Sequence, residues 1–151
     1  MKVVILGADG FIGRHLAFHF RTTGATVLAV ARRTGPLSRM GFDTIAADLT
    51  RPETHDPAFW APHLAGGAHL VNAAGLLTGP EAAMEAVHLK APAAAWAALD
   101  GGHGLLISAV GIDAADTPFA RWRRAGEALV TGKPQVTILR PGLVLADTSY
   151  G

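Results

Sequence analysis

Three glycines near the N-terminus have the spacing of a phosphate-binding turn. Gly7, Gly10 and Gly13 recur at three-residue intervals, after the apolar run Lys2–Leu6 and at the start of a segment of helical character. In such a turn the first glycine permits the tight bend, the second lets a pyrophosphate approach the backbone, and the third lets the helix pack closely on the strand. Unpaired amides and the helix dipole then favour an anion.

This turn is expected to bind the pyrophosphate of a dinucleotide, because it joins a predicted strand to a predicted helix. The alternative is a strand-to-helix turn that has collected glycines without binding a ligand. The loop residues expected to contact the cofactor are Gly7, Asp9, Gly10, Phe11, Ile12 and Gly13.

Two arginines follow the second predicted strand, Thr26–Ala31. A fold that binds NAD usually offers an acidic residue there, about 20 residues after the glycines, to bond the ribose 2′-hydroxyl. Arg32 and Arg33 occupy that stretch instead, and guanidinium groups can hold a 2′-phosphate and stack on adenine. We therefore expect NADP(H) to be preferred, with NAD(H) as the other candidate. The alternative is that both arginines are solvated surface charges.

Short apolar runs alternate with helical segments along the whole chain, which is typical of βαβ units. The runs are continuously apolar, as expected for parallel strands covered on both faces. The expected fold is α/β: a doubly wound parallel sheet of the Rossmann type, strand order 3-2-1-4-5-6, in three α/β/α layers. The predicted strands are Lys2–Leu6, Thr26–Ala31, Thr44–Ala47, His69–Ala73, Gly104–Ser108 and Val136–Leu139.

Helices are expected between these strands. Pro92 should kink or divide the alanine-rich helix, and Thr117 followed by Pro118 is typical of a helix start. Gly35 and Pro36 favour a loop over residues 33–40. The predicted helices are Phe11–Thr23, Pro57–Leu64, Glu81–Leu99 and Pro118–Val130.

Composition excludes several classes of function. The 151 residues suit one domain, and the net charge of +1 provides no field that would attract nucleic acid. No cysteine is present, so disulfides and thiolate sites are excluded.

His15 and His19 have no evident third ligand, so no metal site is expected. No run is long enough to span a membrane or act as a secretory signal, and we expect a cytoplasmic protein.

Four segments resemble the extended or atypical short-chain dehydrogenase/reductases, the NAD-dependent epimerase/dehydratase group. They are Gly7 to Gly13, Ala47-Asp48-Leu49, Asn72-Ala73-Ala74-Gly75 and Leu139-Arg140-Pro141-Gly142. The resemblance implies that Asp48 and Leu49 lie against the adenine. It also implies that Ala73, Ala74 and Gly75 lie along the ribose, and that Pro141 and Gly142 lie near the nicotinamide carboxamide.

In that family a Ser polarises the substrate carbonyl, a Tyr transfers the proton, and a Lys lowers the tyrosine pKa and holds the ribose. Ser108 stands in the expected place, but the Tyr and Lys positions align with Phe119 and Arg123. Phenylalanine cannot transfer a proton, and losing a general acid costs about 10² to 10⁴ in rate. Arg123 could still bond the ribose. Ser108 is as well suited to a strand-end hydrogen bond as to catalysis.

Two other residues are weaker candidates for this site. Tyr150 is the only tyrosine and lies beyond the last predicted strand. His88 stands where the family often has an Asn at the bend of the fourth helix.

The resemblance therefore leaves two functions open. One is a non-catalytic NADP(H)-binding module; the other is an active NADP-dependent oxidoreductase or nucleoside-diphosphate-sugar epimerase-like enzyme that uses Ser108 on an unknown small molecule. One domain is expected over residues 1–151, with a C-terminal substrate domain absent or truncated. A homodimer is also implied, because the fourth and fifth helices are the usual dimer surface in relatives.

Overall fold

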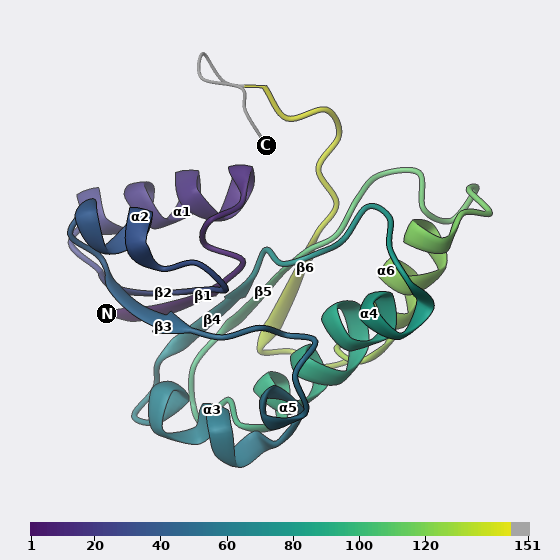
Figure 1. Cartoon of the computed structure of the whole chain (residues 1–151). Coiled ribbons are helices and arrows are strands. Elements are labelled where there is room, and N and C mark those ends of the chain that lie inside the picture. Colours follow the sequence, from purple (N-terminus) through teal and green to yellow (C-terminus); the bar gives the residue numbers. More distant parts are fainter. Residues whose placement is uncertain (146–151) are drawn as a thin grey trace.

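A six-stranded parallel sheet forms the centre of the computed structural model, which describes residues 1–145. Its strand order, β3-β2-β1-β4-β5-β6, confirms the expected doubly wound topology (Figure 1). The third strand lies one residue earlier than predicted, and the fourth and fifth end one residue earlier. The strands are β1 (Lys2–Leu6), β2 (Thr26–Ala31), β3 (Asp43–Ala46), β4 (His69–Asn72), β5 (Gly104–Ile107) and β6 (Val136–Leu139).

Two of the helices begin at side-chain caps. The Asp56 carboxylate accepts a hydrogen bond from the Ala58 amide at 2.8 Å, and the Thr117 hydroxyl accepts one from the Ala120 amide at 3.1 Å. The second bond confirms the predicted start at Thr117. The helical segments are α1 (Phe11–Thr22), α2 (Gly35–Arg39), the 3₁₀ turn η1 (Pro52–His55), α3 (Pro57–Leu64), α4 (Glu81–Glu85), the π-helical turn η2 (Ala86–Lys90), α5 (Ala91–Ala97) and α6 (Pro118–Ala128).

The expected loop over residues 33–40 is wrong, because Gly35–Arg39 forms the short helix α2. Pro36 lies in its first turn, where the missing N–H would have no helical partner. Leu37 is buried and anchors the helix on the sheet.

The alanine-rich helix is interrupted ahead of Pro92, by the π-helical turn Ala86–Lys90. Pro92 has no N–H to offer the His88 carbonyl four residues earlier. Helix α6 approaches that carbonyl at Gly126, where an added Cβ would lie only 2.9 Å from the oxygen. The irregular turn therefore carries His88 to the place where two helices meet.

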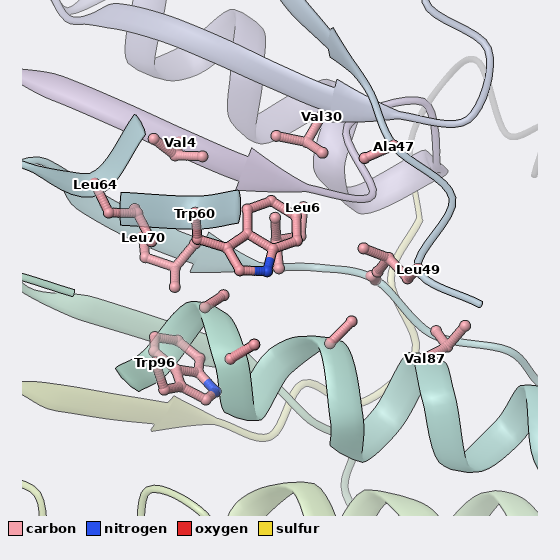
Figure 2. Packing of buried hydrophobic residues seen from close by; sticks show 14 of the residues in the cluster. Val4, Leu6, Val30, Ala47, Leu49, Trp60, Leu64, Leu70, Val87 and Trp96 are labelled. Carbon is pink, nitrogen blue, oxygen red and sulfur yellow. The ribbon is translucent and has the colours of Figure 1, made fainter. Parts of the chain in front are cut away.

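Alternate residues of the strands supply two apolar cores. Val3 and Ile5 of β1 pack under α1 and α2, and Val4 and Leu6 point to the face covered by α3, α5 and α6 (Figure 1). On that second face the Trp60 indole lies between the strands and the helix that carries Trp96 (Figure 2). These two cores hold the strand ends in fixed positions, which is what the site requires.

Candidate functional site

A cavity of about 260 Å³ lies at the carboxyl edge of the sheet, near the lower limit of common small-molecule sites. It lies where the strand order reverses, the place where open α/β sheets bind their ligands. Its lining includes nine residues that the sequence had indicated: Gly7, Asp9, Gly10, Arg32, Asp48, Leu49, Ala73, Ala74 and Gly75.

Six further lining residues were not predicted. Most are small or apolar residues next to strand ends, and Val87 comes from η2. For most of them only a place at or just after the end of a strand could have given a signal, because small and apolar side chains carry no distinctive chemistry. They are Val30, Ala31, Ala47, Thr50, Leu76 and Val87.

The glycine loop has the close packing that its spacing predicted. Gly7 has a φ of +73°, and an added Cβ would lie 2.7 Å from the Ala74 α-carbon. At Gly13 an added Cβ would lie 2.9 Å from the Gly7 carbonyl carbon, so α1 could not approach β1 with a larger residue. Gly10 precedes α1, and no side chain caps that helix start. Phe11 and Ile12 occupy the first turn of α1, just outside the cavity lining.

The acidic and basic residues of the cavity lie close enough to interact. Asp48 accepts hydrogen bonds from the Thr50 amide at 3.0 Å and the Thr50 hydroxyl at 2.8 Å. These bonds, with a smaller contribution from the charge of Arg32, lower the pKa of Asp48. The carboxylate is therefore ionised, and its Oδ1 is bonded within its own turn.

Arg32 and Arg33 point to different places. Arg32 lines the main cavity, whereas Arg33 lies in an adjoining hollow with Asp9 and Arg14. Asp9 lines both. The two arginines therefore line different hollows, which share Asp9.

A buried asparagine shapes the turn after β4. The Asn72 side-chain oxygen accepts a hydrogen bond from the Ala74 amide at 3.1 Å, while the Ala73 amide donates to the Leu6 carbonyl at 3.1 Å. Together they hold Ala73 and Ala74 beside the glycine loop. Asn72 was part of the recognised motif, but its positioning role is visible only in the structure.

Arg123 connects the turn after β4 with the end of β5. Its Nη1 donates to the Ala74 carbonyl at 3.2 Å and to the Ile107 carbonyl at 2.9 Å. Its guanidinium carbon also lies 5.2 Å from the centre of the Phe119 ring. Burial lowers the pKa of Arg123 to about 10, so it remains charged at neutral pH.

His88 packs beneath this arginine. The ring is buried, lies edge-on to Phe119 with 6.1 Å between centroids, and its Nε2 lies 3.1 Å from the Leu76 nitrogen and 3.0 Å from the Leu76 oxygen. Burial, assisted by the charge of Arg123, lowers the pKa of His88 to about 4. The ring is therefore neutral and bonded to the loop that follows β4.

Ser108 follows β5 as expected, but its hydroxyl oxygen is buried and has no hydrogen-bond partner in the described chain. It lies close enough to Glu127 to contribute to lowering the pKa of that carboxyl. The main cause of the lowered pKa is Arg140, whose Nε and Nη2 donate to the two Glu127 oxygens at 2.8 and 2.6 Å. Arg140 also bonds Asp113. Ser108 therefore faces an ion-pair network rather than the cavity.

The remaining predicted residues lie outside the cavity lining. The Pro141 carbonyl accepts a hydrogen bond from the Val110 amide at 3.0 Å, and Gly142 is exposed. Tyr150 lies outside the described residues. Within residues 1–145 no cluster of three histidine or acidic side chains could hold a metal ion, and no helix is both long and apolar enough for a membrane span.

Comparison with known proteins assigns the chain to a family. The model of the NAD-dependent epimerase/dehydratase family matches residues 3–88, more than half of the 151 residues. The chain belongs to the NAD-dependent epimerase/dehydratase family. All lining residues of the cavity fall within the matched part of this epimerase/dehydratase-family chain, whereas Ser108, Phe119 and Arg123 fall beyond it. A search of curated proteins finds no match.

Solved structures share the fold of this family member over most of its length. A short-chain dehydrogenase from Streptomyces avermitilis is 25% identical, with a TM-score of 0.83 over 97% of this chain and 67% of the other. A metagenomic short-chain oxidoreductase in complex with NADP is 24% identical, with a TM-score of 0.76 over 95% and 83%. A short-chain dehydrogenase/reductase superfamily protein from Agrobacterium tumefaciens with bound NAD is 18% identical, with a TM-score of 0.74 over 93% of this chain and 48% of the other. This chain thus spans about half the length of the Agrobacterium protein.

Proposed function

We propose that this epimerase/dehydratase-family chain binds NADP(H) and has lost the proton-transfer residues of a dehydrogenase. The observation that best supports this proposal is the composition of one cavity at the carboxyl edge of the sheet. It is lined by the glycine loop, Arg32, Asp48 and the turn Ala73–Gly75. Structural neighbours with NAD and with NADP bound support a nicotinamide dinucleotide as the ligand.

The cavity fits the phosphate-bearing part of such a cofactor. Gly10 presents backbone without a Cβ at the start of α1, and the first turn of that helix contains no acidic residue. The helix dipole and the free amides there favour a pyrophosphate. Arg32 would hold the 2′-phosphate, and Leu49 would lie against the adenine. NADP(H) bound here would supply hydride-transfer chemistry.

The residues at the family's catalytic positions support binding rather than turnover. Phe119 has no proton to transfer, and Arg123, with a pKa of about 10, stays charged and is bonded to two backbone carbonyls. The Ser108 hydroxyl is buried away from the cavity. These three features together support a degenerate active site.

Active oxidoreductase or sugar-nucleotide epimerase chemistry is the alternative, favoured by the position of Ser108 directly after β5. It requires the buried hydroxyl to become accessible to a substrate. Because this chain covers 48% of the Agrobacterium structure, further residues of a longer protein could complete such a site.

Isothermal titration calorimetry with NADP⁺ and NAD⁺ tests the proposal. We expect NADP⁺ to bind more tightly, and Arg32→Ala to weaken NADP⁺ binding by about tenfold or more, since a hydrogen bond to a charged group contributes ~1.5–3 kcal/mol. Arg39→Ala on the exposed side of α2 is the matched control and should change neither affinity. Failure of both nucleotides to bind would overturn the proposed function. Equal affinities that Arg32→Ala leaves unchanged would remove only the NADP preference.

Measuring NADPH oxidation against a panel of carbonyl compounds separates binding from turnover. The unmodified chain should be inactive, and the double substitution Phe119→Tyr with Arg123→Lys should gain activity if the rest of the site is intact. Robust oxidation by the unmodified chain would favour the enzyme alternative.

A further inference from the structure

Ser108 is the inner end of a chain of polar side chains that leads to the surface. Its side-chain oxygen is buried and lies beside Glu127 of α6. Both Glu127 oxygens accept hydrogen bonds from Arg140, which follows β6, and Arg140 also pairs with Asp113, between β5 and α6. The side chains of Glu127, Arg140 and Asp113 are 10%, 38% and 66% exposed. Arg140 and Asp113 are therefore the solvent-facing end of this chain.

The segment that carries Asp113 is anchored at its start and by α6. Its backbone runs beside the chain after β6 as far as Val110, whose amide donates a hydrogen bond to that chain at 3.0 Å. Gly111 follows with a φ of +81°, and an added Cβ there would meet no other atom. Ile112 is buried but belongs to neither apolar core, and a side chain of α6, Arg124, donates to two carbonyls of the segment. Movement about Gly111 would therefore leave both cores intact.

The two ion pairs of Arg140 differ in strength. The pair with Glu127 consists of two hydrogen bonds, of 2.8 and 2.6 Å, to a carboxylate that is mostly buried. The pair with Asp113 involves an exposed carboxylate, so water and salt screen it. Two charge-assisted bonds to a mostly buried carboxylate are the stronger of the two interactions. Arg140 should therefore stay bonded to Glu127 while its pair with Asp113 breaks and re-forms.

The closed arrangement leaves two buried polar atoms unsatisfied at the end of β5. Neither the Ser108 hydroxyl oxygen nor Arg123 Nε has a hydrogen-bond partner in the described chain. They belong to one region, because Arg123 is bonded to the carbonyl of Ile107, the residue before Ser108. A buried polar atom without a partner costs free energy, and access to a hydrogen-bonding molecule would recover it. This cost favours opening, and the ion pairs oppose it.

We propose that residues 111–117 form a lid that covers the Ser108 hydroxyl and is hinged at Gly111. The ion pair between Asp113 and Arg140 is the latch that holds the lid closed. When the latch is released, the hydroxyl becomes accessible to solvent and to a carbonyl or hydroxyl group of a substrate, as the enzyme alternative requires. The lid contributes no residue to the lining of the cavity, so the inference does not depend on nucleotide binding.

A single introduced thiol tests whether the lid opens. The chain has no cysteine, so Ser108→Cys places the only thiol at the position of the buried hydroxyl. Val3→Cys in β1 is the control, because Val3 is also buried but lies far along the sheet in an apolar core. Without denaturant, iodoacetamide should modify the thiol at position 108 at least about tenfold faster than the thiol at position 3, which only global unfolding exposes. Equal rates would show that no lid opens.

Asp113→Asn in the Ser108→Cys background tests the latch. Losing one exposed ion pair should raise the modification rate about twofold to fivefold. High salt should raise the rate of the Ser108→Cys protein similarly and leave that of the double variant unchanged. Asp116→Asn is the matched control: it removes the same charge from the same segment, but Asp116 pairs with Arg121 of the adjoining helix at 3.2 Å. Its rate should not change, and an equal effect of both substitutions, or of neither, would refute the latch.

Hydrogen exchange followed by mass spectrometry gives the answer if a cysteine variant does not fold. In the chain with its native Ser108, high salt should speed exchange over residues 111–117, and Asp113→Asn should remove this dependence on salt. Exchange that salt does not change would count against the latch. None of these measurements contains a nucleotide, so the lid and the proposed function can fail separately.

Discussion

The guanidinium of Arg123 lies in the space that a side chain at Gly75 would need, since an added Cβ there would lie 3.0 Å from the arginine Cζ. Gly75, in the predicted motif after the fourth strand, thus leaves room for the arginine at the position where the resemblance expects a lysine. The two positions are 48 residues apart in the sequence and form one structural unit at the ends of β4 and β5.

This contact predicts that substitutions at the two positions are coupled. Gly75→Ala should displace the arginine and lower the free energy of unfolding by about 1–3 kcal/mol, because hydrogen bonds to two carbonyls are lost. In an Arg123→Ala background the same substitution should cost less than about 0.5 kcal/mol. Urea unfolding of the four proteins of this cycle measures the coupling. If Gly75→Ala lowers the free energy of unfolding equally with and without Arg123, the contact between the two positions does not contribute to stability.

Two glycines with a positive φ should differ in how much stability the protein loses when each is replaced by alanine. Gly7 and Gly24 have φ values of +73° and +88°, but only Gly7 would bring its Cβ against backbone, while Gly24 faces open space. Gly24→Ala should cost about 1–2 kcal/mol from backbone strain. Gly7→Ala should cost about 2–5 kcal/mol and abolish nucleotide binding, because overpacking adds to the strain. Thermal unfolding and calorimetry of both variants check this, and similar losses at both positions would contradict it.

Glu127 predicts a contribution to stability that disappears in acid. Its hydrogen bonds with Arg140 lower its folded pKa below the ordinary value of 4.5. The stabilisation is therefore complete above about pH 4.5 and is lost as the pH falls through the folded pKa. Glu127→Gln should be less stable by about 1–2 kcal/mol at neutral pH, and the difference should shrink in acid.

The control for this titration is Asp116→Asn, which removes an exposed ion pair with Arg121 and should cost less than about 0.5 kcal/mol. Denaturant unfolding as a function of pH compares the three proteins. A Glu127→Gln deficit that does not change with pH would mean that the carboxylate charge contributes nothing.

Because of His88, we expect the protein to begin losing stability at a higher pH than the loss that Glu127 causes. Its folded pKa of about 4 is below the ordinary 6.5, because burial and Arg123 disfavour the charged ring. The unfolded chain therefore binds more protons between these values, and stability should fall as the pH drops from 6.5 towards 4. His88→Gln should flatten this part of the profile. An NMR titration of the ring that shows a midpoint near 6.5 would contradict the burial of His88.

Arg32 and Arg33 should contribute unequally to NADP⁺ binding, because only Arg32 lines the main cavity. Arg33→Ala should weaken binding less than about threefold, compared with tenfold or more for Arg32→Ala. Calorimetry of both variants at the same ionic strength makes the comparison. A larger effect of Arg33→Ala would place the 2′-phosphate in the hollow shared by Arg33, Arg14 and Asp9.

Local patterns in the sequence were sufficient for the fold. The doubly wound parallel sheet follows from alternating apolar runs and helices, the start of α6 from Thr117 and Pro118, and the glycine loop from its three-residue spacing. In each case the deciding interaction is between residues close in the chain, or is a periodic burial that every strand repeats. The helix Gly35–Arg39 was missed because the burial of Leu37 against the sheet, a tertiary contact, outweighed the usual preference of Gly35 and Pro36 for a loop.

The sequence alone determined that this chain is a doubly wound domain of the epimerase/dehydratase type, with a glycine-rich turn after its first strand and with Phe119 and Arg123 where the resemblance expects a tyrosine and a lysine. Only the tertiary structure decided which partners these side chains meet: Arg123 is bonded to the carbonyls of Ala74 and Ile107, Ser108 lies beside Glu127, and Arg32 and Arg33 line different hollows. The physical reason is that residue type fixes which bonds a side chain can make. Which partners it meets depends on residues distant in the chain that packing brings within hydrogen-bond distance.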